Sequence, residues 1–255
     1  MKKSLAALCL VVALTIPALA AWDLTTLNHH IDQTNFQVGS GCSGTLISVE
    51  ERYILTANHC LGEYITKDKD VETYKDVPIS QPMTNKGEKV GDITYIGTIV
   101  ARDQKDDLAL IQLKSEKIQS YLKIKLLPKN KVITRGEKVW LIGNPLGHYG
   151  SVTEGIVSST ERNNKGSRDV QFSGGIAWGN SGGMVLNGEG YLIGVAVRMD
   201  GISKGGYPFP AMHLGFASHI ENVYKLLDKM CKTSVYDPAA NDVECKKQDL
   251  SKPAG

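Results

Sequence analysis

Between Val38 and Gly215 the chain is a succession of short apolar runs interrupted by Gly, Asn, Asp and Pro. The runs are rich in Val, Ile, Leu and Thr, which favour extended backbone, whereas the interrupting residues favour turns. Many short strands at close spacing are typical of antiparallel barrels and sandwiches, so an all-β fold is expected. The clearest strands are expected at 44–48, 53–56, 94–100, 108–113, 138–142, 152–158, 184–186 and 191–197.

One helix is expected after the last strand, over residues 218–231. Apolar residues recur there at three- and four-residue spacing, which gives one stripe that can dock on a barrel. These residues are Ile220, Val223, Tyr224 and Leu227. Ser218 and Glu221 have the spacing of a capping box, so Ser218 is the expected N-cap. The polar residues 232–255 are expected to form a tail with little structure.

Residues 1–20 have the pattern of an export signal. Lys2 and Lys3 form a basic start, residues 5–16 are largely apolar, and a Pro-Ala-Leu-Ala sequence follows. The apolar stretch is too short for a stable transmembrane helix, and the small residues after it match a cleavage site. We therefore expect a secreted or periplasmic protein, cleaved near Ala20 and without a membrane anchor afterwards. The remainder is long enough for one large domain or two small ones that share an interface.

The balance of charge gives no support for nucleic acid as a partner. The whole chain has 29 Lys and Arg against 27 Asp and Glu, and loss of the two leader lysines makes these numbers equal. A near-neutral protein lacks the basic field that steers polyanions to a surface. Residues 114–131 are rich in Lys, but their basic and apolar positions are mixed without a clean face. They are interpreted as a solvated connector between two groups of strands.

Four cysteines remain after the leader: Cys42, Cys60, Cys231 and Cys245. An even number in an exported chain indicates disulfides, and three pairings are possible. The spacing favours Cys42–Cys60 and Cys231–Cys245. Neither pair has the spacing of zinc ligands, and no histidine completes a metal-ligand set. No metal or other cofactor is therefore expected.

Three short motifs, Thr-Ala-Asn-His-Cys, Asp-Leu-Ala-Leu and Gly-Asn-Ser-Gly-Gly, occur in this order and contain His59, Asp107 and Ser181. A serine hydroxyl is a poor nucleophile until an imidazole takes its proton, and the imidazole needs a carboxylate to fix its tautomer. The three motifs together predict a Ser-His-Asp catalytic constellation. The backbone amides of Gly179 and Ser181 are the expected oxyanion hole, because the glycines leave room for a substrate carbonyl.

Two nearby carboxylates compete with Asp107 for the third role. Asp107 leads directly into an apolar strand, where a carboxylate without a partner would be costly to bury. A histidine N–H would satisfy this carboxylate and would itself be oriented. Asp103 and Asp106 are each followed by a polar residue and are typical of a turn. Asp107 is therefore favoured.

These residues resemble the chymotrypsin/trypsin-like serine peptidase family over residues 39–230. Within this family the bacterial Deg/Htr-type peptidases are the most similar branch. Four further motifs carry this second resemblance, at 141–147, 152–158, 192–195 and 214–217.

The resemblance implies two six-stranded antiparallel β-barrels with the active site in the cleft between them. The peptidase domain would span 21–231, with barrels at about 36–128 and 129–216 and the C-terminal helix after them. His59 and Asp107 would come from the first barrel and Ser181 from the second.

The chain also departs from the family pattern. In trypsin-like zymogens an aspartate before the serine pairs with a newly cut N-terminus, but here this position is Asn180. Activation by N-terminal clipping is therefore not expected. Deg-type enzymes usually carry a C-terminal PDZ domain, and no such domain is expected within residues 232–255. The pair Cys42 and Cys60 is more similar to secreted trypsin-type enzymes.

The resemblance also places a candidate substrate pocket. Gly175 occupies the position where trypsin has its acidic pocket base, and Ile176 follows it. Ala196, beside Val197, occupies the position of the histidine in glutamyl endopeptidases. Trp178 is placed either at the pocket rim or in the core. Without a charged group at these positions, cleavage is expected after small or medium apolar residues.

The function expected from the sequence is an exported serine endopeptidase that acts on protein or peptide substrates. The alternative is a catalytically silent protein that keeps the protease fold for binding or regulation. A serine esterase of another fold is disfavoured, because the Gly-x-Ser-x-Gly elbow and the chain order Ser, Asp, His are missing.

Overall fold

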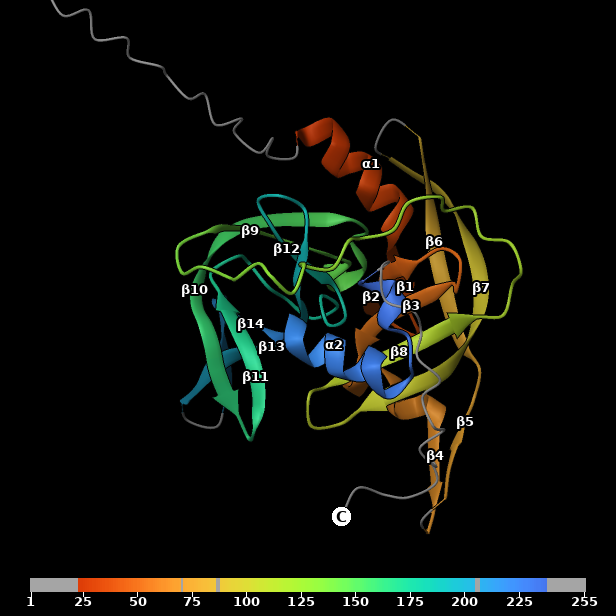
Figure 1. The fold of residues 1–255 in the computed structure, drawn as a ribbon. Coiled ribbons are helices and arrows are strands. Elements are labelled where there is room, and N and C mark those ends of the chain that lie inside the picture. Colours follow the sequence, from red (N-terminus) through yellow and green to blue (C-terminus); the bar gives the residue numbers. More distant parts are fainter. Residues whose placement is uncertain (1–22, 70, 86–87, 205–206, 238–255) are drawn as a thin grey trace, which may run out of the picture.

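Two closed barrels of antiparallel strands make up the fold and lie side by side (Figure 1). The structure is a computed structural model that describes residues 23–69, 71–85, 88–204 and 207–237. Each barrel has six strands, which confirms the expected all-β, two-barrel architecture. The expected signal peptide lies outside the described residues. Within the described ranges, no helix is both long and apolar enough to cross a bilayer.

The first barrel follows the order β1-β2-β3-β8-β7-β6 around its wall. Its strands are β1 (Asn35–Val38), β2 (Cys42–Ser48), β3 (Tyr53–Ala57), β6 (Val77–Asn85), β7 (Glu88–Asp103) and β8 (Leu108–Leu113). Phe36, Leu46, Ile54 and Ile111 are fully buried in its interior. A separate two-stranded hairpin of β4 (Ile65–Asp68) and β5 (Val71–Tyr74) was not predicted.

The second barrel follows the order β10-β11-β14-β13-β12-β9. Its strands are β9 (Lys138–Gly143), β10 (Ser151–Asn164), β11 (Ser167–Phe172), β12 (Met184–Asn187), β13 (Leu192–Lys204) and β14 (Tyr207–His219). The pairing of β13 with β14 continues to Lys204 and Tyr207, well beyond the strand expected to end at 197. The two strands therefore form a long hairpin that had not been predicted.

The connector between the barrels is only partly solvated. Lys114, Lys125 and Lys129 are exposed, as expected. Ile124 and Leu127, however, are buried in the larger apolar core. The prediction of a solvated segment was therefore wrong for these apolar residues, which anchor the connector against both barrels.

The C-terminal helix α2 (Ile220–Lys229) is shorter than the expected 218–231 and does not begin with the expected capping box. Ser218 still belongs to β14, and its hydroxyl donates to the carbonyl oxygen of Asp106 at 2.6 Å. The N-cap is His219, whose Nδ1 accepts from the amide of Glu221 at 3.0 Å. Burial lowers the pKa of His219 to about 4, so the ring is neutral and able to accept at neutral pH.

An N-terminal helix, α1 (Leu24–Thr34), precedes the first barrel and was not predicted. Its N-cap Asp23 accepts from the amide of Thr26 at 2.7 Å, as a capping aspartate does. Leu27 and Ile31, four residues apart on one face, are buried. The helix is therefore docked on the molecule, above the first barrel in Figure 1.

The first residues of the expected tail are also structured. A 3-10 turn, η3 (Thr233–Val235), follows α2, and Lys232 forms an ion pair with Glu51 at 2.7 Å. The ring of Tyr236 packs on Tyr224 with centroids 4.7 Å apart. Residues 238–255 lie outside the described residues.

Candidate active site

Strand pairing in the first barrel brings His59 beside Asp107. His59 lies in the 3-10 helix η1 (Asn58–Tyr64), directly after β3, and Asp107 directly precedes β8. The end of β3 pairs with the start of β8, with Ala57 opposite Leu108. Two residues 48 positions apart in the chain are thus placed at the same edge of the sheet.

Both carboxylate oxygens of Asp107 accept hydrogen bonds from His59. The ring nitrogen Nδ1 lies 2.7 Å from Oδ2, and the backbone amide donates to Oδ1 at 2.9 Å. The amide of Asn58 also donates to the Asp107 carbonyl oxygen, at 3.1 Å. This arrangement fixes the orientation of the imidazole and leaves Nε2 as the nitrogen that can take a proton.

The structure distinguishes Asp107 from its two neighbours. Asp103 accepts from the amide of Asp106 at 3.0 Å and forms an ion pair with Lys229 at 2.7 Å. These contacts close a turn and fasten α2, and they do not involve His59. Asp107 itself has a left-handed backbone, with φ of 51°, which Asp tolerates better than most residues.

The motif around Ser181 lies between β11 and β12 and packs against the first barrel. The carbonyl oxygen of Ser181 accepts from the amide of Ser43 at 2.8 Å and lies 3.8 Å from the Cys60 sulfur. A Cβ at Gly182 would lie 2.1 Å from the Ser43 carbonyl oxygen and 2.3 Å from the Thr56 hydroxyl. Only glycine fits this close approach, which places Ser181 against the segment that carries His59.

The two amides expected to form the oxyanion hole are available for a ligand. In the described part of the chain, the N–H groups of Gly179 and Ser181 donate no hydrogen bond within the protein. Gly179 has φ of +97°, a conformation that favours glycine. Both amides lie in the segment where the second barrel faces the first.

A disulfide joins Cys42 at the start of β2 to Cys60 in η1, as the spacing favoured. It closes a loop over a sequence separation of 18 residues and fixes the backbone next to His59. A loop of this length contributes about 3 kcal/mol in the chain-entropy model. The sulfurs also lie close to His59, but they are bonded to each other and are not thiolate ligands. Cys245 lies outside the described residues, so its pairing with Cys231 stays a prediction.

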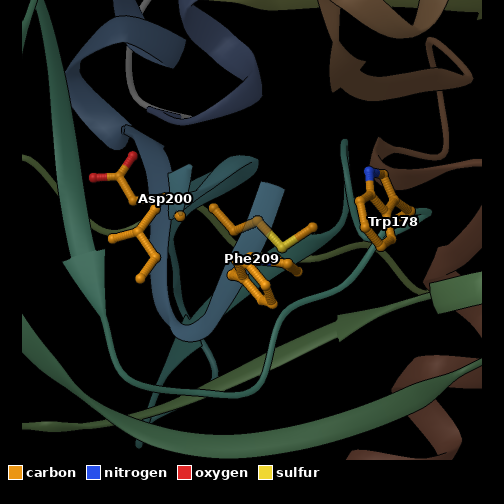
Figure 2. A pocket seen from close by; sticks show the side chains of 7 residues that line it. Trp178, Asp200 and Phe209 are labelled. Carbon is orange, nitrogen blue, oxygen red and sulfur yellow. The ribbon is translucent and has the colours of Figure 1, made fainter. Parts of the chain in front are cut away.

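An apolar pocket of about 330 Å³ lies between Trp178 and the long β13–β14 hairpin. Figure 2 shows Trp178 at one end of the pocket, Asp200 at the other and Phe209 between them. The lining consists of Trp178, Met199, Asp200, Gly201, Ile202, Phe209 and Pro210. Trp178 is 66% exposed, so of its two expected placements the structure favours the rim.

The other residues expected in the substrate pocket do not line this cavity. Ile176, Ala196 and Val197 are buried, and Gly175 is half-buried. The carbonyl oxygen of Gly175 accepts from the Thr153 hydroxyl at 2.7 Å. Met199, Ile202 and Phe209 were not predicted, because the strands expected from the sequence stopped before the hairpin.

A family model described as a trypsin-like peptidase domain matches residues 42–195. The match covers more than half of the chain and runs from the start of β2 into β13. The chain belongs to the trypsin-like peptidase domain family. The matched residues include His59, Asp107 and Ser181, so the candidate site lies within the family's domain.

The curated relatives that are similar in sequence to this chain include HtrA-type proteases. "Serine protease HTRA2, mitochondrial" from Drosophila ananassae is 30% identical over 176 residues, which are 62% of this chain and 40% of the relative. "Probable periplasmic serine endoprotease DegP-like" from Buchnera aphidicola subsp. Schizaphis graminum is 30% identical over 197 residues, which are 74% of this chain and 35% of the relative. The chain thus spans less than half the length of these relatives, and it resembles these Deg/Htr-type proteases over the matched residues.

Proposed function

We propose that this chain is an exported serine endopeptidase that hydrolyses peptide bonds through an acyl-enzyme intermediate. The observation that carries the proposal is the double contact of Asp107 with His59, opposite the segment of Ser181. A carboxylate that orients an imidazole in this way is what a general base needs. An inactive relative kept for binding alone would have no need for this arrangement.

The chemistry follows from these groups. The Ser181 oxygen attacks the scissile carbonyl while His59 Nε2 takes the serine proton, and the amides of Gly179 and Ser181 donate to the new oxyanion. His59 then gives its proton to the leaving amine, and the C–N bond breaks. Water hydrolyses the remaining ester by the same two steps, with His59 again as base and then acid. Asp107 holds the ring and stabilises its charged form throughout.

The pH dependence of activity should reflect the His59–Asp107 pair. The hydrogen bond to Asp107 raises the pKa of His59 above its ordinary value of 6.5, and partial burial opposes this change. The ring therefore keeps its proton to higher pH, and activity should be lost as pH falls through a midpoint above 6.5. The measurement is kcat/KM for a peptide substrate from about pH 5 to 9. A midpoint below 6.5, or a flat profile, would contradict the role of His59.

We further propose cleavage after small or medium apolar residues. The pocket next to Ser181's segment offers Met199, Ile202 and Phe209 as apolar walls. Its one carboxylate, Asp200, is paired with Arg198 and is not a free counter-charge for a basic substrate. Burying an aliphatic side chain contributes about 1.5–3 kcal/mol, whereas an unpaired Lys or Arg would be costly to desolvate.

Profiling on a peptide library tests both the reaction and the preference. We expect cleavage after Val, Ala, Ile or Leu, and none with Ser181→Ala protein under the same conditions. Asp200→Asn should leave the preference unchanged, since that carboxylate is already neutralised by Arg198. Dominant cleavage after Arg, Lys or Glu would contradict the proposed pocket, and equal cleavage by Ser181→Ala would contradict the reaction.

Export is proposed on two observations. The first twenty residues have the composition of a cleaved leader, and the folded part contains the Cys42–Cys60 disulfide. Disulfides persist mainly in oxidising compartments such as the periplasm or the exterior of the cell. N-terminal sequencing of the protein recovered from its natural compartment should begin near residue 21.

A further inference from the structure

The two peptide groups on either side of the Gly179 Cα are each held by one hydrogen bond. The amide of Leu146 donates to the Trp178 carbonyl oxygen at 2.8 Å, and the Ser43 hydroxyl donates to the Gly179 carbonyl oxygen at 2.7 Å. In a planar trans peptide the N–H points opposite to the preceding carbonyl. The Gly179 N–H is therefore directed away from Leu146, and a flipped peptide would lose that bond.

The loop that holds the Trp178 carbonyl is in an unfavourable conformation. Leu146 has φ of 53°, in the left-handed region that residues with a Cβ rarely adopt, and Gly147 and Gly150 are also left-handed. Such a conformation persists only where its surroundings determine it. The loop from Asn144 to Gly150 thus needs contacts from elsewhere to keep Leu146 in place.

Those contacts come from the end of α1 and the residue after it. The side chain of Asn35 donates to Asn144 Oδ1 at 2.7 Å, and the Gly150 amide donates to the same oxygen at 3.1 Å. The Tyr149 hydroxyl lies 3.1 Å from the Asn35 carbonyl oxygen and 3.3 Å from that of Ile31. The start of the loop is thereby tied to Asn35, directly after α1, and its end to both Asn35 and Ile31 of α1.

The buried pair of Asn35 and Asn144 includes a hydrogen-bond acceptor without a partner among the described residues, which is energetically unfavourable. Asn35 and Asn144 are almost fully buried, and Asn35 Oδ1 has no hydrogen-bond partner among the described residues. Buried polar atoms are usually paired, so an orphaned acceptor calls for an explanation. Asn144 donates through Nδ2 to the Phe36 carbonyl oxygen and accepts through Oδ1 from the Gly150 amide, so Asn35 must present its NH₂ group to that oxygen.

The helix itself is anchored to the first barrel. Leu27 and Ile31 are buried, and Gln81 on β6 donates to the Asp32 carbonyl oxygen at 3.2 Å. A Cβ at Gly150 would lie 3.0 Å from Ile31, so the helix also packs directly on the loop. A rigid barrel, α1 and the loop thus form one continuous chain of contacts to the Trp178–Gly179 peptide.

We infer that α1, together with Asn35 directly after it, is an activating element, which holds the Gly179 N–H in its donor orientation through Tyr149 and the 144–150 loop. In trypsin-like zymogens a newly cut N-terminus pairs with an aspartate before the serine and so supports the site. The neutral Asn180 cannot form that ion pair, and α1 would supply the support instead. Ser43 holds the following peptide group, Gly179–Asn180, through the Gly179 carbonyl oxygen. These are positioning residues, and the inference rests on the proposed serine peptidase function.

Three variants test it: Ser43→Ala, Asn35→Leu and Tyr149→Phe. Asn35→Leu removes the bond to Asn144, and Tyr149→Phe removes the hydroxyl contacts to α1 and Asn35. Ser43→Ala removes the bond to the Gly179 carbonyl oxygen and also the acceptor of the Asn144 amide. Tyr149→Phe is the mildest change should Asn35→Leu fail to fold. We expect kcat to fall about 10²-fold for Ser43→Ala, as for loss of an oxyanion donor. About three- to tenfold is expected for each of the other two, the effect of one hydrogen bond. KM should stay within about threefold.

The decisive probe is a peptide aldehyde whose last residue is the one after which the enzyme preferentially cleaves in the peptide library. Its adduct with Ser181 places an oxyanion in the oxyanion hole. In each variant the inhibition constant of the aldehyde should rise by about the same factor by which kcat falls. The dissociation constant of the cleaved product should stay unchanged. The matched control is Asn187→Ala, a buried asparagine that caps the β12–β13 turn through the amides of Glu189 and Tyr191. It should lower the melting temperature comparably and leave kcat and aldehyde binding intact.

The outcomes separate this inference from the proposed function. An inactive wild type whose Ser181 does not react with a fluorophosphonate probe would contradict the proposed function itself. An active wild type in which Tyr149→Phe, and Asn35→Leu where it folds, keep full kcat and aldehyde affinity would overturn the inference alone, whatever Ser43→Ala does. Losses in kcat that match the loss of stability, and that Asn187→Ala reproduces, would likewise overturn it.

Discussion

Replacing Ser181 with Ala should lower kcat by about 10⁶-fold, because the nucleophile is lost and the other two groups then have no hydroxyl to activate. A small residual rate over uncatalysed hydrolysis should remain from substrate binding and the oxyanion amides. The fold should be unaffected, since Ser181 is fastened through its backbone carbonyl to the amide of Ser43. The measurement is kcat on a peptide substrate, together with the melting temperature.

Ser115→Ala is the matched control, because that exposed hydroxyl donates only to the Lys117 carbonyl oxygen on the connector. It should keep full activity. A Ser181→Ala protein that retains more than about one hundredth of wild-type turnover would contradict the assignment of the nucleophile.

Asp107→Asn should lower kcat by about 10⁴-fold with little loss of stability. Both carboxylate oxygens accept from His59, so an amide must set its NH₂ against one of these donors. The ring then turns or takes the wrong tautomer. Because the hydrogen bond that raises the pKa of His59 is lost, the midpoint of the residual pH profile should also move to lower pH.

Asp103→Asn and Asp106→Asn are the matched controls for this variant. Asp103 fastens the turn and α2, and an amide oxygen can still accept from the Asp106 amide. Both variants should keep turnover close to wild type. If Asp106→Asn were the sensitive one instead, the proposed role of Asp107 would be wrong.

The barrels could be predicted because their signals are local. β-branched runs bounded by turn residues mark strands wherever they pair, and the short His, Asp and Ser motifs sit at the ends of such runs. The helix α1 also has a local signal, although a short one: Asp23 at the N-cap, with Leu27 and Ile31 four residues apart. Its other residues are largely polar, His29 and His30 among them, so the apolar stripe is too short to predict the helix from the sequence.

Other features depend on contacts between distant parts of the chain. Ser218 has the sequence of an N-cap, but its hydroxyl is taken by the carbonyl of Asp106, 112 residues away. The residues that line the pocket likewise could not be predicted from the sequence. Bulges between Ala196 and Arg198, and between Met199 and Gly201, interrupt the alternation of β13, so position alone does not tell which side chains face the cavity.

The central claim is that Ser181 is a nucleophile activated by His59 and Asp107, and a fluorophosphonate probe measures this most directly. Only a hydroxyl with a base beside it and an oxyanion hole around it reacts quickly with such a probe. Peptide mapping of the labelled wild-type protein should find the adduct on Ser181 alone, and the Ser181→Ala protein should remain unlabelled. Labelling that persists in Ser181→Ala, or folded wild-type protein that stays unlabelled, would contradict the claim.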